Sequence, residues 1–179
     1  MEQRTAKINI SSAGGTASQS SKTYKVTLPT TWLEAMGITA EQRDLVLSFD
    51  GKAISLSRRV SGPDFALQQR RLGHDVRILR LYDGEELCSS IYADMTSQLV
   101  VVENQEISTI KTAFGNNTLP NWTDFQNFLA ERCISGQRSG LREYLEVLGL
   151  EEYDPLAIIE KTGGRMAEDQ QWLTIEVMK

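Results

Sequence analysis

The side chains best suited to acid–base chemistry gather between residues 161 and 172. Glu168 and Asp169 follow closely after Arg165, so carboxylates and a guanidinium stand together there. Adjacent carboxylates point in different directions, and general acid–base catalysis needs a further positioned group that the sequence does not supply. We therefore expect Arg165 to pair with an acid and fix this loop, and Trp172 to pack into the core.

Other catalytic and metal-binding patterns do not occur in the sequence. His74 is the only histidine and has no second ligand at helical spacing, so we expect a mobile loop histidine and no metal cluster. There is no Gly-Lys-Ser or Gly-Lys-Thr phosphate loop and no Gly-x-Ser-x-Gly turn. Cys88 and Cys133 fit no metal spacing and are expected to be small buried hydrophobes. The sequence thus predicts no enzyme activity, no catalytic residues and no cofactor.

Composition and charge limit the partners of the chain. The 179 residues, 40% of them apolar, suit one large domain or two small ones. No apolar run is long enough to cross a bilayer and no signal peptide is visible, so we expect a cytoplasmic protein with no membrane contact. Residues 1–60 hold eight basic and five acidic side chains, whereas the remainder holds eleven basic and nineteen acidic ones. Phosphate attraction is therefore expected only in the first part, although an ordinary solvated surface explains the same charge.

Residues 24–59 predict a small unit that must position these basic residues. A strand with Val26 and Leu28 on one face ends at Pro29, and a short helix follows, capped by Thr30 or Thr31 and ending at Gly37. An Asp50-Gly51 turn between two alternating runs predicts a β-hairpin. A unit of this size cannot bury its own apolar surface, so we expect it to pair with a second copy of itself.

This order of elements resembles the swapped-hairpin DNA-binding domains of the AbrB, SpoVT and MazE antitoxin group. The similarity covers about residues 5–59, and its matching features are Lys25-Val26, Leu28-Pro29, Met36-Gly37-Ile38 and the hairpin around Asp50-Gly51. The resemblance implies a barrel-like, intertwined homodimer that binds DNA, often at its own promoter.

Two features depart from that group. Leu33 and Glu34 stand where its short helix often carries paired arginines, and a long serine-rich loop spans residues 11–21. The residues expected to contact DNA are Lys7, Lys22, Lys25, Arg58 and Arg59.

The second part of the chain predicts an α+β domain. Ser61-Gly62-Pro63 marks a boundary, and we expect a polar linker over residues 61–74, with a short helix possible, before a domain at 75–179. The expected strands are 76–82, 86–92 and 98–103, forming an antiparallel meander, with a final strand at 172–177. The expected helices lie at 107–114, from about 121 to 133, at 141–148 and at 154–163.

Two function classes follow for this acidic domain. Within it, residues 131–138 and 150–156 resemble a C-terminal module of AbrB-like proteins on bacterial plasmids, phages and toxin–antitoxin loci. The first class is a dimeric DNA-binding regulator of antitoxin type whose acidic domain binds a protein. The alternative is an inhibitor of a bacterial defence nuclease, such as a CRISPR effector, because an acidic surface can occupy a phosphate channel. The residues expected to contact the protein partner are Glu151, Glu152, Tyr153, Asp154, Glu168 and Asp169.

Overall fold

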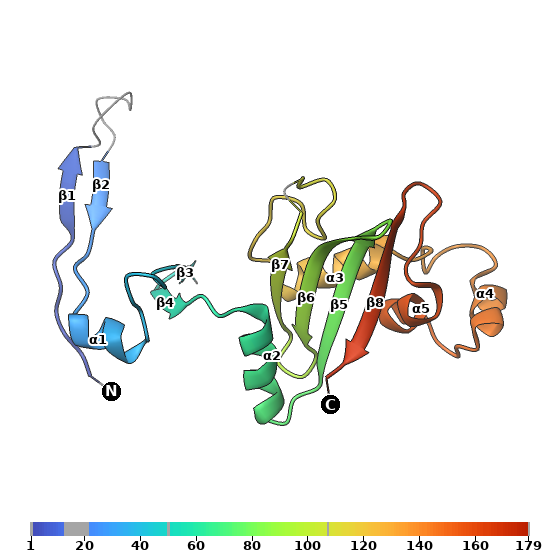
Figure 1. Cartoon of the computed structure of the whole chain (residues 1–179), viewed down its shortest axis with the longest axis horizontal. Coiled ribbons are helices and arrows are strands. Elements are labelled where there is room, and N and C mark those ends of the chain that lie inside the picture. The colour runs from blue at the N-terminus through green and yellow to red at the C-terminus, as the bar shows by residue number, and fades with distance from the viewer. Residues whose placement is uncertain (1, 13–21, 50, 107, 179) are drawn as a thin grey trace. The chain divides into compact units, whose positions relative to one another are not determined.

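The chain is mixed α+β and divides into two compact units, residues 1–59 (unit 1) and 60–179 (unit 2). The computed structural model describes residues 2–12, 22–49, 51–106 and 108–178. All described sheets are antiparallel, as Figure 1 shows, and within one chain none of them closes into a barrel. The α+β class expected from the sequence is therefore confirmed.

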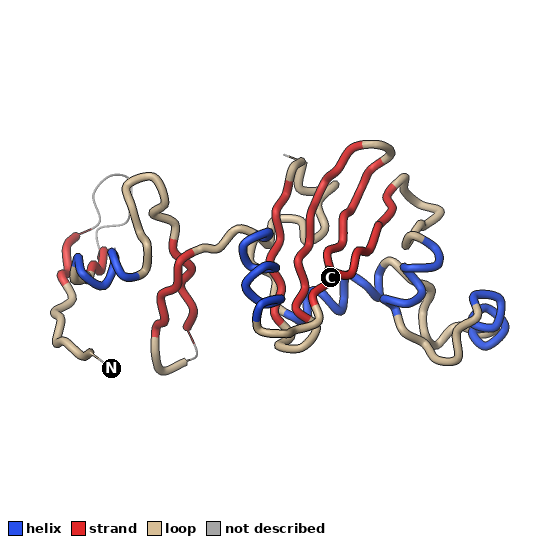
Figure 2. The backbone as a smooth tube through the Cα atoms, turned by 60° about the horizontal axis from the view of Figure 1, so that its bottom comes forward, coloured by secondary structure: helices blue, strands red, loops and turns tan. Residues whose placement is uncertain are grey.

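Unit 1 consists of two hairpins joined by a short helix (Figure 2). Strand β1 (Asn9–Ser12) pairs with β2 (Lys22–Lys25), helix α1 spans Thr30–Ala35, and β3 (Leu45–Phe49) pairs with β4 (Ile54–Arg58). The predicted hairpin is thus present, whereas its Asp50 and the serine-rich loop from residue 13 onward lie outside the described residues.

The boundaries of α1 differ in part from those predicted. Pro29, in extended conformation, occupies the N-cap without any side-chain hydrogen bond, so the predicted threonine cap is wrong. The ring of Pro29 fixes its φ, so the helix begins after Pro29 without a side-chain hydrogen bond to its first N–H groups. The C-terminal prediction is correct: Gly37 has φ 68°, and Ile38 N donates to Leu33 O at 2.9 Å. The preceding strand ends at Lys25, before Val26 and Leu28.

Unit 2 is built on a four-stranded sheet in the order β7-β6-β5-β8. The predicted meander is present as β5 (Val76–Asp83), β6 (Glu86–Asp94) and β7 (Leu99–Asn104), and β8 (Gln171–Val177) joins it beside β5. Helices α3 (Trp122–Glu131), α4 (Leu141–Leu148) and α5 (Pro155–Thr162) agree with the apolar spacing and the glycines of the sequence.

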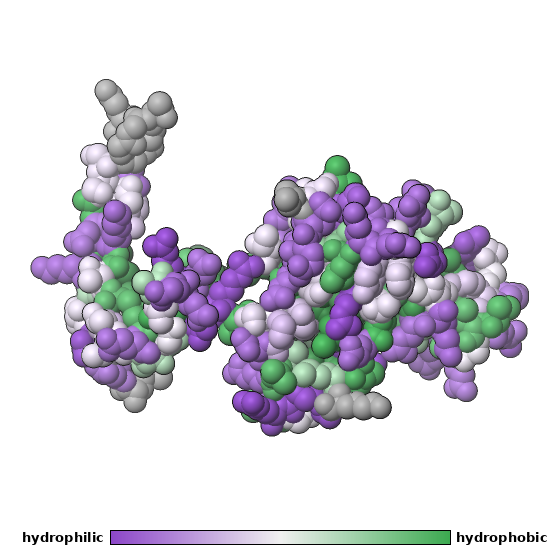
Figure 3. All heavy atoms as spheres, in the orientation of Figure 1, coloured by the Kyte–Doolittle hydropathy of each residue, from purple (hydrophilic) through white to green (hydrophobic). Residues whose placement is uncertain are grey.

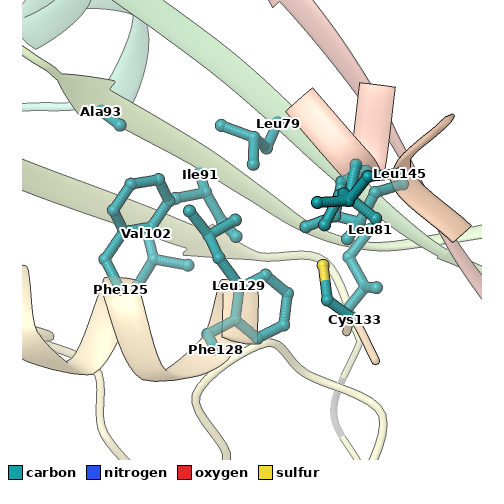
Figure 4. Packing of buried hydrophobic residues seen from close by; sticks show 13 residues of the cluster. Leu79, Leu81, Ile91, Ala93, Val102, Phe125, Phe128, Leu129, Cys133 and Leu145 are labelled. Atoms are coloured by element: carbon teal, nitrogen blue, oxygen red, sulfur yellow. The ribbon is translucent and has the colours of Figure 1, made fainter. Parts of the chain in front are cut away.

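The two faces of this sheet carry different cores. One face packs Leu79, Leu81 and Ile91 against the apolar sides of α3, α4 and α5 (Figure 4). The other face packs Ile78 and Tyr92 against helix α2 (Gly62–Arg71), which lies on the opposite side of the sheet from α3 and α5 (Figure 1). Alternation along each strand divides the side chains between the two cores.

Helix α2 corrects the expectation of a linker over residues 61–74. Ser61 caps it by accepting from Asp64 N at 3.2 Å, and Phe65 and Ala66 are buried against the sheet. Gly62 is also closely packed: its N–H donates to Glu103 Oε1 at 2.7 Å, and an added Cβ would lie 2.1 Å from the Tyr92 ring. Most residues of this segment are polar, so the sequence pattern does not reveal the narrow apolar stripe that packs the helix against the sheet of unit 2.

A second correction concerns the helix expected at 107–114. Ile107 lies outside the described residues, and residues 109–116 form a series of turns. Tertiary hydrogen bonds hold this loop: Ala113 N donates to Ser89 Oγ at 3.1 Å, and Lys111 O accepts from Gln171 Nε2 at 3.0 Å. These long-range bonds satisfy backbone groups that a helix would have paired locally.

Candidate functional site

The β1–β2 hairpin of unit 1 has one apolar and one polar face. Ile10 lies directly opposite Tyr24, and both side chains are more than half exposed. On the other face Asn9 lies opposite Lys25, and Ser11 lies opposite Thr23. Side chains two residues apart share a face, so one hairpin presents hydrophobic groups on one side and hydrogen-bonding groups on the other.

The predicted DNA-binding residues are divided by this alternation. Lys25 belongs to the polar face, whereas Lys22, three residues earlier, belongs to the face of Tyr24. Lys7 is exposed and lies two residues before the start of β1, outside the strand. The hairpin thus presents Lys25 on its polar face, and Lys22 does not share that face.

The β3–β4 hairpin is amphipathic in the same way. Leu47 lies opposite Leu56 and Phe49 opposite Ile54, all on one face, while the other face carries mainly serines. Phe49 is 70% exposed and Leu47 is 65% exposed. Arg58 continues the apolar face at its end.

Arg58 and Arg59 are held to different degrees. The Arg58 guanidinium donates to Gln42 Oε1, and an added Cβ on Gly37 would lie 3.3 Å from this guanidinium. Arg58 therefore ties β4 to the segment after α1. The backbone of Arg59 donates to Asp44 O at 3.2 Å, and its side chain is exposed. Of the two, Arg59 has the side chain that is more available to a ligand.

Unit 1 lacks a core of its own. None of its described residues is buried, and apolar side chains are visible at its surface in the space-filling view (Figure 3). Trp32 of α1 is only half-buried, and the Arg4 guanidinium lies 5.7 Å from its ring centre. The apolar faces of the described hairpins of unit 1 are thus left to be covered by a partner.

The expected partner-binding residues after α4 have distinct roles. Glu151 and Glu152 are exposed carboxylates that make no hydrogen bond or ion pair with other described residues. Asp154 caps α5 by accepting from Leu156 N at 2.9 Å. Tyr153 is half-buried and donates to Ile134 O at 2.9 Å, and burial raises the pKa of its phenol. Glu151 and Glu152 are therefore the part of this set that is available to a partner.

Glu168 and Asp169 are also unlike one another. Glu168 is exposed, whereas Asp169 accepts from both terminal nitrogens of Arg132, at 2.6 and 3.2 Å. The hydrogen bond from Arg132 lowers the pKa of Asp169 more than burial raises it. Arg132 is 8% exposed and also donates to Gly164 O and Gln171 O. Asp169 is therefore part of the internal framework.

Contrary to the sequence expectation, Arg165 forms no ion pair with any acid among the described residues. Its guanidinium lies 5.1 Å from the centre of the Trp172 ring. Trp172 is half-buried rather than in the core: it stacks on Tyr82 at 4.6 Å, and its Nε1 donates to Gly84 O at 2.7 Å. The acid that fixes this loop is Asp169, and its partner is Arg132, which the sequence reading missed because the two lie 37 residues apart.

His74, predicted to lie in a mobile loop, is instead fixed by Asp94. Its Nδ1 lies 2.7 Å from Oδ2 of the fully buried Asp94 and 3.1 Å from Ser97 Oγ. Burial raises the pKa of Asp94, but hydrogen bonds from His74, Ser97 and Thr96 outweigh it and lower the pKa. A catalytic relay needs the serine at the other ring nitrogen, Nε2, so this trio connects loops and does not form a serine–histidine–aspartate triad.

Neither metal-binding nor membrane-spanning features occur in the described part of the chain. The described residues contain no group of three or more His, Cys, Asp or Glu side chains placed to hold a metal ion. None of the described helices combines the length and the apolar character needed to cross a bilayer. Cys88 and Cys133 are buried free thiols, as expected, and burial raises the pKa of Cys133 to about 11.

No protein-family model, no curated protein and no solved structure matches this chain. The likeness of residues 5–59 to the AbrB group therefore rests on the order and spacing of the residues themselves.

Proposed function

We propose that this protein is a dimeric DNA-binding transcriptional regulator of antitoxin type, with an acidic unit that binds a protein partner. One observation carries the proposal: unit 1 has no buried residue among those described, yet both of its hairpins present an apolar face. Such a unit requires a partner for stability.

A second copy of unit 1 is the partner that fits best. Two copies related by a twofold axis bring together the same apolar faces, which are self-complementary in kind. Full burial of a large apolar side chain contributes about 1.5–3 kcal/mol. The apolar faces of each copy offer Ile10, Tyr24, Leu47, Phe49, Ile54 and Leu56 for this purpose. The swapped-hairpin dimer implied by the resemblance to the AbrB group would cover these faces.

Dimerisation would also strengthen the attraction of unit 1 for the phosphates of DNA, although one copy has only a small positive net charge. Residues 1–59 carry eight basic and five acidic side chains, and a dimer doubles this excess on one body. Lys25 lies on the polar face of its hairpin, away from Ile10 and Tyr24, so an apolar dimer interface leaves it free for phosphate. We propose Lys25, Lys7 and Arg59 as the main phosphate contacts, with Lys22 and Arg58 at the margin.

Light scattering and a DNA-binding titration test this proposal on the full chain. We expect twice the 20.1 kDa mass of one chain at micromolar concentration. Binding to a fragment of its own promoter should weaken steeply with salt, and Lys25→Glu should weaken it on every sequence. Arg43→Glu changes the charge by the same two units at an exposed position of unit 1 outside the proposed contacts, and it serves as control. A monomer, or equal affinity of Lys25→Glu and wild type, contradicts the proposal.

The charge of unit 2 supports a protein partner rather than a nucleic acid. Residues 60–179 hold nineteen acidic and eleven basic side chains. The same charge favours the second candidate, an inhibitor of a defence nuclease, in which unit 2 occupies a basic nucleic-acid channel. The two candidates differ in the partner, and co-purification from a host lysate followed by a nuclease assay separates a toxin from an effector nuclease.

A further inference from the structure

Unit 2 has a groove between α3 and the loop that precedes it. The groove has a volume of about 410 Å³. Four residues of α3 line one side at spacings of three and four, so they share one helical face: Asp124, Asn127, Phe128 and Glu131. The loop contributes Phe114 and Asn117 to the opposite side. The groove is distinct from the acidic residues expected to bind the partner.

The walls of the groove are held in place by contacts within unit 2. The rings of Phe114 and Phe128 meet at 5.3 Å with a 52° tilt and supply its apolar surface. Asn117 Nδ2 donates to Asp124 Oδ2 at 3.1 Å, which ties the loop to the first turn of α3. Ala113 N donates to Ser89 Oγ, which ties the loop to β6. The groove is therefore formed before any ligand arrives.

Its polar groups favour one kind of occupant. No residue described as lining the groove is basic. The exposed side chains of Asn127 and Glu131 make no hydrogen bond or ion pair with other described residues, so their oxygens remain available as acceptors. An apolar surface with acceptors at its edge and an acidic unit around it is complementary to a cation on an apolar stem.

We propose that this groove binds an arginine side chain presented by the protein partner. A guanidinium packs flat on an aromatic ring and donates two parallel hydrogen bonds to a carboxylate. Phe114 and Glu131 offer these two elements on opposite walls of the groove. A lysine ammonium lacks the planar fork, so arginine is the preferred residue. The inference rests on the proposed function, in which unit 2 binds a protein.

NMR of the full chain can test this with the peptides acetyl-Gly-Arg-Gly-amide and acetyl-Gly-Lys-Gly-amide. The arginine peptide should shift the amide signals of residues 113–117 and 124–131, and the lysine peptide should bind more weakly. Glu131→Gln should weaken binding of the arginine peptide about three- to tenfold, by loss of a charge-assisted bond. Glu152→Gln removes the same charge from an exposed site outside the groove and should change affinity less than about twofold.

A second variant tests the groove by filling it with a side chain of the proposed kind. Asn127→Arg places a guanidinium on the exposed helix face at the groove, and it should abolish the shifts while α3 remains folded by circular dichroism. Equal losses in Glu131→Gln and Glu152→Gln, equal binding of both peptides, or shifts spread over the whole acidic surface would overturn the proposal. So would the absence of shifts at about 10 mM peptide, a concentration that detects even millimolar affinity. Dimerisation and DNA binding are measured on the full chain by light scattering and DNA titration, not with these peptides, so a negative result here is distinct from a failure of those tests of the proposed function.

Discussion

Replacing Arg132 by methionine should lower the free energy of unfolding of unit 2 by about 3 kcal/mol. The guanidinium is 8% exposed and joins the end of α3 to Gly164, Asp169 and Gln171. Methionine keeps much of the apolar volume but leaves two carbonyls and one carboxylate without their donor. Loss of one partner of a buried pair costs about 3–5 kcal/mol. Water reaches Asp169, whose side chain is 35% exposed, so we expect the lower end of that range.

The acid partner should show the same coupling. Asp169→Asn keeps the shape of the side chain but removes its charge, and it should cost about 1–2 kcal/mol. The two losses should not add in the double variant, because each removes the same pair. The pKa of Asp169 is lowered in the folded protein from the usual value of 3.8. Its contribution to stability is therefore present above about pH 4 and is lost as the pH falls through the lowered pKa.

Urea unfolding followed by tryptophan fluorescence measures these effects, because Trp122 and Trp172 both belong to unit 2. The matched control is Arg138→Met, which removes the same charge at an exposed position. If the free energy of unfolding of Arg132→Met lies within about 0.5 kcal/mol of that of this control at pH 7, the hydrogen bonds of Arg132 contribute no net stability and the reasoning is refuted. A stability difference between wild type and Asp169→Asn that persists unchanged at pH 2 would refute the linkage argument.

Two further substitutions test the two units separately. Leu47→Asp should convert the proposed dimer to a monomer at about 10 μM, because a charge would be buried in its proposed apolar interface. Light scattering measures the mass. As a control, Val147→Asp at an 85% exposed position of α4 should leave the mass of the protein unchanged. If Leu47→Asp remains a dimer, the expected interface is wrong. Gly62→Ala should lower stability by about 1–3 kcal/mol, because its methyl group meets the Tyr92 ring. Thermal unfolding measures this loss, and Gln68→Ala on the exposed side of α2 is the control. Equal melting temperatures of Gly62→Ala and Gln68→Ala would show that α2 shifts to accept the methyl group without loss of stability.

Local patterns in the sequence predicted much of the fold of unit 2. Alternation gave the meander of β5, β6 and β7, and apolar spacing with glycines gave the helices α3, α4 and α5. Asp154 caps α5 as predicted, with Pro155 at its first position. Such signals lie within a few residues of one another, so they are readable without tertiary context.

Several of the features that the sequence analysis missed share one physical cause, which is distance along the chain. Arg132 and Asp169 are 37 residues apart, and His74 and Asp94 are 20 apart. Side-chain pairs of this kind have no local period that could reveal them. Of these four residues, Asp94 had a local signal, since Thr96 and Ser97 lie two and three residues after it and donate their N–H groups to its carboxylate. The helix predicted at 107–114 is wrong for a related reason: the loop at 109–116 keeps short local turn bonds, but Ser89 and Gln171 pair with Ala113 N and Lys111 O from far along the chain.

The position of β8 has a consequence for protein synthesis. This strand leaves the ribosome after the rest of the sheet, yet it pairs with β5 along seven residue pairs and buries Leu173. In a nascent chain that ends at residue 170, the edge of β5 that later pairs with β8 has no hydrogen-bonding neighbour. The core of unit 2 then also lacks the side chains of β8. Translation proceeds at about 5–20 residues per second, so β5 waits for seconds before its second neighbour is made. During that interval the open edge of β5 is the part of unit 2 most exposed to chaperones and to mispairing with other chains.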